Sequence, residues 1–372
     1  FDDAILASKE LELTLTGKDC GLEERAPMCG VPYHAVDVYL NRLVSKGYKV
    51  AIGEQVEDPK LAKGLVKREV IRVVTPGTNL NVQSLEAGKN NYLLSVAYTP
   101  DGIGISAADV TTGDYYVTEV EDLKKLNDEL MKYEPSEIIC NEAFLVSGFD
   151  VNDLKSRLHI SVNALESHMF DDDGCRRILM KHFKVNTLIG LGVEEFPTGL
   201  LAAGALLQYL YDTQKTDLEH FTHIYPYLTS KYMLLDSSTR RNLELTETLR
   251  EKQKRGSLLW VLDKTKTAMG ARLLRNYIEQ PLIEKDEMEK RLDAIQELNQ
   301  DSISRDEIRE YLNPIYDLER LLSKVTYKTA NPRDLIAFRN SLQMLPPIKT
   351  VLSAFEKEEL TEIREQIDGL ED

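Results

Sequence analysis

The stretch from 92 to 120 constrains the fold more than any other part of this 372-residue chain. Three short runs rich in β-branched and aromatic residues, at 92–98, 103–110 and 115–120, are separated by Thr-Pro-Asp-Gly and Thr-Thr-Gly-Asp. Each separator is typical of a turn, with a glycine to supply positive φ. The runs therefore predict an antiparallel meander of three strands.

A helix and a further strand extend this meander into a layered α/β domain. A helical pattern covers 122–133, and the apolar run 137–140 predicts a parallel strand in the centre of the sheet. A second helical segment at 198–213 is expected to close the domain. The sequence therefore predicts one β-β-β-α-β domain over 88–228.

The residues before this domain alternate between short helices and strands. The segment 35–46 carries apolar residues at helical spacing and ends before a glycine that suits a helix C-cap. Strands are expected at 48–55 and 66–75, the second ended by Pro-Gly, and a polar linker at 79–91. We expect a first, mixed α/β domain over 1–81.

From about residue 229 the strand signals stop. Prolines and a glycine divide the remainder into helical segments, which predicts an all-α array over 229–372. Within it, 284–299 predicts an amphipathic helix. Its apolar face consists of Met288, Leu292, Ile295 and Leu298.

The charge balance is acidic overall and basic in one place. The net charge of -16 disfavours a nucleic-acid partner on total charge alone. Between residues 60 and 72, however, five basic residues stand against the single acid Glu69. The cysteines form no C-x-x-C pair, no apolar run suits a membrane span, and the chain starts without a signal peptide or Met. We expect a cytosolic chain with reduced thiols that has lost its beginning.

The spacings that mark common catalytic sites are absent from the sequence. It has no phosphate loop, no G-x-S-x-G and no H-E-x-x-H. His220 and His223 form a lone H-x-x-H, for which a polar turn is a simpler explanation than a metal site. Asp109 and Asp114 end two meander strands where a two-metal nuclease would keep carboxylates, but Asp beside Thr-Thr-Gly is ordinary hairpin chemistry. We expect no metal, no cofactor, no ATP binding and no enzymatic activity in this chain.

The loop 27–34 is the most suggestive element of the first domain. Two prolines and a glycine stiffen it, and its apolar side chains are unusual for a solvated loop. Such a wedge suits the minor groove of DNA, while the basic stretch would contact phosphates. Two plainer interpretations remain open: a loop folded onto its own core, and a strand edge protected by lysines. The candidate DNA-binding residues are Met28, Cys29, Gly30, Val31, Pro32, His34, Lys63, Lys67, Arg68 and Arg72.

A series of short motifs extends over the whole chain. The first domain carries P-M-C-G-V-P-Y-H-A and R-V-V-T-P-G-T, and the second carries D-V-T-T-G-D and L-L-A-A-G-A-L-L-Q-Y-L-Y-D-T-Q-K. The helical part carries L-L-D-S-S-T-R-R-N-L-E-L-T-E and G-S-L-L-W-V-L-D-K-T-K-T-A-M-G-A-R-L-L-R. In this order the motifs resemble the bacterial DNA mismatch-repair family MutS. The resemblance implies a mismatch-recognition domain, an RNase H-like connector and a partial helical core, with DNA mismatch repair as the function.

The resemblance also implies roles and partners. It places 239–245 where the core meets the connector, so we expect Arg241, Asn242 and Glu244 to be structural interdomain residues, with Leu243 buried. The implied partners are mismatched duplex DNA, a MutL-like protein docked on the connector, and a second copy in a homodimer. The implied location is the bacterial cytoplasm, at the nucleoid.

Three features that the resemblance implies for the family do not appear in this chain: a Phe-x-Glu motif, a DNA clamp and an ATPase domain. The family's Phe-x-Glu motif, whose Phe stacks on the mispaired base, lies just upstream of a stretch like residues 1–4. The family's DNA clamp and its ATPase domain, which binds ATP and Mg²⁺, follow the matched region. We expect this chain to lack all three and to bind duplex DNA weakly, with little preference for a mismatch.

Two other functions stay open. An RNase H-like nuclease would share the strand order but would need clustered carboxylates and a divalent metal. An acidic interaction scaffold would share the helical array but would leave the basic stretch unexplained.

Overall fold

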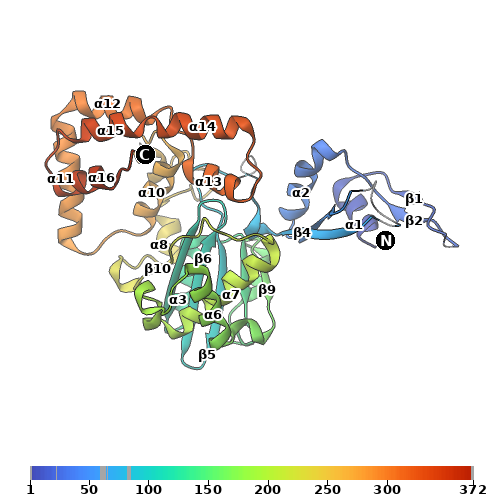
Figure 1. Cartoon of the computed structure of the whole chain (residues 1–372). Helices are drawn as coiled ribbons and strands as arrows, with labels where there is room; N and C mark the ends of the chain where they lie inside the picture. Colours follow the sequence, from blue (N-terminus) through green and yellow to red (C-terminus); the bar gives the residue numbers. More distant parts are fainter. Residues whose placement is uncertain (1, 22, 59–63, 65, 82–84, 370–372) are drawn as a thin grey trace.

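The computed structural model of the protein describes residues 2–21, 23–58, 64, 66–81 and 85–369. Its elements fall into three groups: an N-terminal unit, a central unit built on a six-stranded sheet, and a C-terminal helical unit. Figure 1 shows the N-terminal unit standing to one side, joined to the central unit through its last strand. No helix of the described residues is long and apolar enough to cross a membrane.

The N-terminal unit combines two helices with two antiparallel ribbons, each of two strands. Its elements are α1 (Asp2–Leu11), β1 (Thr16–Lys18), β2 (Ala26–Met28), η1 (Tyr33–Ala35), α2 (Val36–Val44), β3 (Val50–Gln55), β4 (Arg68–Val74) and η2 (Pro76–Thr78). The predicted helix and both predicted strands are confirmed by α2, β3 and β4, and Gly47 follows α2 with φ +88°. The β1/β2 ribbon and α1 are additions to the prediction. A small apolar cluster of Leu40, Val44 and Val74, with Val50 and Ile52 packed against it, holds α2 against the β3/β4 ribbon.

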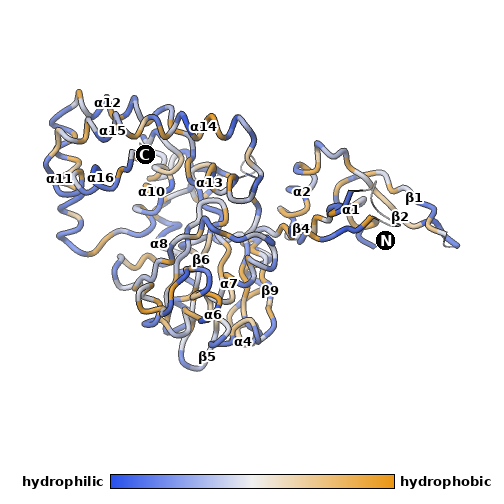
Figure 2. Tube along the Cα trace, in the orientation of Figure 1, coloured by the Kyte–Doolittle hydropathy of each residue, from blue (hydrophilic) through white to orange (hydrophobic). Residues whose placement is uncertain are grey.

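The six-stranded sheet of the central unit has the order β10-β7-β6-β5-β8-β9. Its strands are β5 (Leu93–Thr99), β6 (Gly102–Asp109), β7 (Asp114–Val120), β8 (Glu137–Cys140), β9 (Ser161–Ala164) and β10 (Tyr225–Pro226). The antiparallel meander β5-β6-β7 and the parallel strand β8 are confirmed, and β9, which was not predicted, runs parallel to β8. Figure 2 shows hydrophobic segments gathered in this sheet and in the long helix against it.

Helices cover both faces of the sheet. They are α3 (Leu123–Tyr133), α4 (Glu142–Leu145), α5 (Val151–Ser156), α6 (Asp172–Phe183) and α7 (Pro197–Gln214), with the short turns η4 (Ser167–Phe170), η5 (Ile189–Leu191) and η6 (Val193–Glu195). Helices α6 and α7 pack on the face that holds Leu93, and α3, α4 and α5 pack on the face that holds Leu94. Because both faces are covered, the central strands β5 and β6 are buried along most of their length.

The helical unit contains no strand among the residues described, apart from an isolated bridge between Tyr232 and Leu282. Its elements are η7 (Thr229–Lys231), α8 (Ser237–Asn242), α9 (Leu258–Leu262), α10 (Ala268–Glu279), α11 (Lys285–Gln300), α12 (Ser302–Leu312), α13 (Leu318–Thr326), α14 (Pro332–Leu342), α15 (Leu345–Leu352) and α16 (Glu358–Gln366). The helix predicted at 284–299 is confirmed as α11, but its apolar residues Leu292 and Ile295 are 62% and 61% exposed. Leu298 is half-buried and packs in the apolar cluster around Ala294. The helix packs on its neighbours α12 and α16 through the side that holds Ala294, which is buried.

Candidate nucleic-acid interface and the interdomain junction

The loop between β2 and α2 lies on the surface of the N-terminal unit. At its two ends, Met28, the last residue of β2, is 45% exposed, and Tyr33, the first residue of η1, is 87% exposed. The other candidates of the loop are exposed or half-buried: Cys29, Gly30, Val31, Pro32 and His34. This exposure disfavours the interpretation in which the loop folds onto its own core. Tyr33, an aromatic ring beside a stiffening proline, is the residue of this loop that the sequence analysis did not single out as a candidate.

Two of the basic candidates lie on the β3/β4 ribbon with their side chains in solvent. Lys67 and Arg68 are exposed at the start of β4, where Arg68 pairs with Gln55 of β3. The Lys67 ammonium lies 2.5 Å from the Glu69 carboxylate, but both side chains are well exposed, so this pair is weak and can exchange for a phosphate. Lys63 lies outside the described residues.

Arg72 does not belong to this exposed set, which disfavours the phosphate contact expected for it. It is half-buried, and no described residue accepts a hydrogen bond from its Nε. Burial lowers the pKa of Arg72, and Tyr327, the residue after α13, and Asp37 of α2 act on it in the opposite direction. Arg72 therefore faces the helical unit, and Lys67 and Arg68 remain as the described candidates for phosphate contacts.

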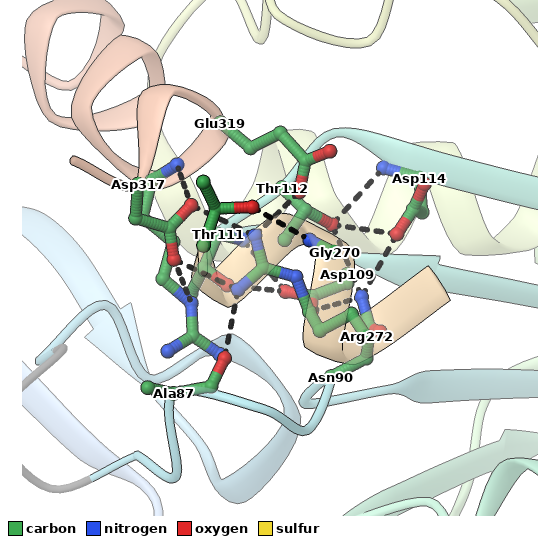
Figure 3. A network of polar contacts seen from close by, with 12 residues as sticks. Ala87, Asn90, Asp109, Thr111, Thr112, Asp114, Gly270, Arg272, Asp317 and Glu319 are labelled. Atoms are coloured by element: carbon green, nitrogen blue, oxygen red, sulfur yellow. Dashed lines mark hydrogen bonds and ion pairs between the residues drawn. The ribbon is translucent and has the colours of Figure 1, made fainter. Parts of the chain in front are cut away.

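The two carboxylates at the end of the meander have hydrogen-bond partners within their own hairpin (Figure 3). Asp109 is buried, and its Oδ1 accepts hydrogen bonds from the backbone N–H and the hydroxyl of Thr111, at 2.8 and 2.7 Å. Its Oδ2 accepts from the Asn90 amide at 3.0 Å and from the Asn91 N–H at 2.9 Å. Burial, and then the charge of Asp109, raises the pKa of Asp114 to about 6. These contacts favour hairpin chemistry over a two-metal site.

The histidine pair does not converge on a ligand. His220 is buried and its Nε2 lies 3.1 Å from the carbonyl oxygen of Val110, while His223 is exposed. Burial lowers the pKa of His220 to about 4, so the ring is neutral at pH 7 and Nε2–H is the donor of that bond. Within the described ranges, no group of three or more His, Cys, Asp or Glu side chains is placed to hold a metal ion.

The helical unit meets the segment that leads into the central sheet in a polar junction that the sequence did not reveal. In Figure 3 the guanidinium of Arg272, from α10, lies against Asp317 at the start of α13. It donates to both Asp317 oxygens at 2.8 and 2.7 Å, to Glu319 at 2.5 Å and to the Ala87 carbonyl at 2.9 Å. Arg320, also from α13, donates to the carbonyls of Glu86 and Lys89. Two arginines of the helical unit thus hold the segment that leads into the central sheet.

A second contact between the helical and central units involves Arg240 instead of Arg241. Arg240 donates to the carbonyls of Leu235 and Glu279 at 3.0 and 2.7 Å, and the acids of α3 lie near it. The other expected interdomain residues face solvent or bond locally: Arg241 and Asn242 are exposed, and the Glu244 carboxylate accepts from the Leu249 N–H at 2.7 Å. The expected burial of Leu243 is wrong, because Leu243 is exposed and Leu245 is buried.

Replacing Arg240 with alanine should lower the free energy of unfolding by about 2 kcal/mol, because two carbonyl groups lose a charged donor at a half-buried site. Chemical denaturation followed by circular dichroism measures this change. Arg241→Ala is the matched control, one position along the same helix but exposed. Equal losses in the two variants would show that Arg240 holds no special contact.

Comparison with known proteins gives the same family along the whole chain. Models of MutS domains I, II and III match residues 1–83, 91–222 and 238–371. The chain is 63% identical, over all of its 372 residues, to the DNA mismatch repair protein MutS of Lachnoclostridium phytofermentans. It is 52% identical, again over its full length, to the DNA mismatch repair protein MutS of Ruminiclostridium cellulolyticum. The chain spans 40% and 43% of the length of these two curated relatives.

Proposed function

Because this chain belongs to the MutS family, we propose that it serves DNA mismatch repair as the part of a MutS protein that meets mismatched duplex DNA. The observation that carries the proposal is the match of residues 1–83 to MutS domain I. Within those residues lie the exposed loop after β2 and the exposed cations of β4. An interaction scaffold would give no reason for either feature.

The chemistry of the two surfaces fits duplex DNA. A stiff loop that presents Met28 and Tyr33 to solvent suits insertion beside bases, where an apolar side chain replaces part of the stacking. Lys67 and Arg68 suit phosphate oxygens, which position a protein on DNA without reading its sequence. A mismatch weakens stacking and makes the duplex easier to bend, so a wedge gains most at such a step.

The remaining units have proposed roles in the same protein. We assign 1–81 to mismatch recognition, 88–228 to an RNase H-like connector and 229–372 to part of the helical core. The RNase H-like assignment is supported by an antiparallel meander followed by two strands parallel to its first strand. A MutL-like partner on the connector and a homodimer are proposed from the family, as is work on bacterial DNA at the nucleoid.

We propose no enzymatic activity and no cofactor for these residues. The proposal assigns the ATPase of the family, with its ATP and Mg²⁺, to the more than half of the relatives' length that this chain does not span. The alternative of a nuclease has little support, because the Asp109 carboxylate is already occupied by four hydrogen bonds.

We expect weak binding to duplex DNA that falls steeply with salt, and almost equal affinity for a matched and a G·T duplex. The phosphate-contacting side chains are present, whereas the family's stacking Phe and its Glu are not among the 372 residues. Fluorescence anisotropy over a salt series would measure both affinity and its salt slope. Lys67→Ala and Arg68→Ala should each reduce the slope by about one.

The matched control is Lys285→Ala, an exposed lysine on α11 of the helical unit. It should leave both affinity and slope as they are. Binding that is insensitive to Lys67 and Arg68 but lost in the control would place the DNA on another surface. A preference for the mismatch of about tenfold would assign mismatch reading to the loop itself, for example to Met28 or Tyr33.

A further inference from the structure

Glu137, the first residue of β8, is a fully buried acid, and both of its carboxylate oxygens accept hydrogen bonds. Its Oε1 accepts hydrogen bonds from Tyr209 at 2.8 Å and from Asn163 at 3.1 Å, both inside the central unit. Its Oε2 accepts from the hydroxyl of Thr75 and from the N–H of Gly77 at 3.1 Å. The hydrogen bonds to Oε1 therefore come from the central unit, and those to Oε2 come from the end of the N-terminal unit.

Both strands of the β3/β4 ribbon reach this carboxylate at the base of the ribbon. Val50 pairs with Val74 there, so the residues just beyond that pair, Lys49 and Thr75, stand opposite each other. Thr75 donates to Glu137, and the Lys49 ammonium lies 3.8 Å from Oε1 of the same side chain. The ammonium also lies 5.3 Å from the centre of the Tyr209 ring.

The backbone that follows the ribbon fits tightly against the central sheet. A Cβ placed on Gly77 would lie 2.8 Å from the Cβ of Leu93 and 3.0 Å from the Cβ of Glu137. Only glycine allows this approach, which brings the Gly77 N–H to the carboxylate. The hydroxyl of Thr78 bonds back to Thr75 at 2.9 Å and closes the turn.

On the side of α2, packing next to this contact is open. A cavity of about 500 Å³ separates the end of α2 from the central unit, with Asn41 and Gly47 on one side and Ser136 and His159 on the other. Since the apolar cluster of Leu40, Val44 and Val74 lies within the N-terminal unit, it does not fix that unit to the sheet. Strand β4 also packs on α7, where Gln214 donates to the Val73 carbonyl at 3.5 Å, and Asn91 donates to the Pro76 carbonyl at 3.1 Å. Among these contacts, Glu137 is the one whose side chain meets residues from both strand ends at the base of the ribbon.

We propose that Glu137 is a positioning residue that sets the direction in which the β3/β4 ribbon leaves the central sheet. Through the ribbon it sets where Lys67 and Arg68 are presented to DNA. The second step rests on the proposed function, whereas the first concerns only the two units. A carboxylate suits this task because it accepts several hydrogen bonds at once, which a carboxamide cannot do on both sides.

The test separates the two sides of the carboxylate. Thr75→Val and Lys49→Met remove donors of the N-terminal unit and leave Tyr209 and Asn163 in place. Spin labels at Val38→Cys and Val146→Cys, in a Cys20→Ser, Cys29→Ser background, report the distance between the units, since both sites are exposed. We expect the distance distribution to broaden in the double variant, and duplex affinity to fall about threefold to tenfold because the ribbon must be ordered on binding.

Tyr209→Phe is the control, because it removes a donor from Oε1 and leaves Oε2 bonded to Thr75 and Gly77. It should lower the melting temperature of the central unit while the distance distribution stays narrow. A narrow distribution in the Thr75→Val, Lys49→Met variant would overturn the proposal. If that distribution broadens but the parent chain binds no DNA, the positioning step stands and the proposed DNA-binding function fails.

Discussion

Replacing Arg272 with alanine is expected to lower the free energy of unfolding by about 3–5 kcal/mol, because it leaves Asp317 without its bidentate partner at a largely buried site. The guanidinium is 4% exposed, so water does not substitute for it. The Ala87 carbonyl loses its donor in the same step. Urea denaturation followed by circular dichroism measures the loss, as a shift of the transition that includes the helical unit.

Two further variants test whether the ion pair between Arg272 and Asp317 accounts for this loss of stability. In a double-mutant cycle with Asp317→Asn, the single variants should lose more free energy of unfolding in sum than the double variant loses. The reason is that the second change removes the acid that the first change leaves unpaired. Arg157→Ala breaks an exposed pair with Asp153 and should leave the transition nearly unchanged. Additive losses at Arg272 and Asp317 would contradict the view that they act as one unit.

The parts of the fold that the sequence predicts are those fixed by local chemistry. Turn tetrapeptides with a glycine set the limits of β5, β6 and β7, and an apolar run after a proline identifies β8. The sequence does not predict strand β9, because this strand has only four residues, Ser161–Ala164, of which two are polar. It becomes a strand by pairing with β8.

Two predictions for the helical unit fail because the sequence does not determine which side of a helix faces its neighbours. Adjacent residues on a helix differ in direction by about 100°, so Arg240 and Arg241 face different surroundings. The sequence places two arginines in α8 but does not say which one faces α3 and α10. The same holds for α11, where the side that packs is chosen by α12 and α16 and not by the most apolar stripe.

Sequence patterns do not predict the polar contacts between the units. Glu137 is 62 positions from Thr75 and 72 from Tyr209, and Arg272 is 185 positions from Ala87. In the printed sequence each of these charged residues is one among many in an amphipathic or short apolar segment. Their burial and their partners appear only when the units are brought together.

Replacing Gly104 with alanine should destabilise the central unit by about 4 kcal/mol, since the added Cβ would meet backbone rather than a flexible side chain. That Cβ would lie 2.0 Å from the carbonyl oxygen of Thr198, in the first turn of α7. The helix would have to move away from β6, and the N–H groups of Thr198 and Gly199 would leave the Glu119 carboxylate that accepts from them at 2.5 and 2.9 Å. Loss of these contacts adds to the steric cost.

Thermal unfolding of Gly104→Ala, followed by circular dichroism, measures this effect. Gly53→Ala is the matched control, because Gly53 also lies in a strand but a Cβ there would meet only the Glu69 carbonyl at 3.8 Å. The control should unfold like the parent chain or slightly above it, since alanine reduces the conformational freedom of the unfolded state. A Gly104→Ala protein with the parent melting temperature would mean that α7 can slide on β6, and that the close approach is not what holds the layers together.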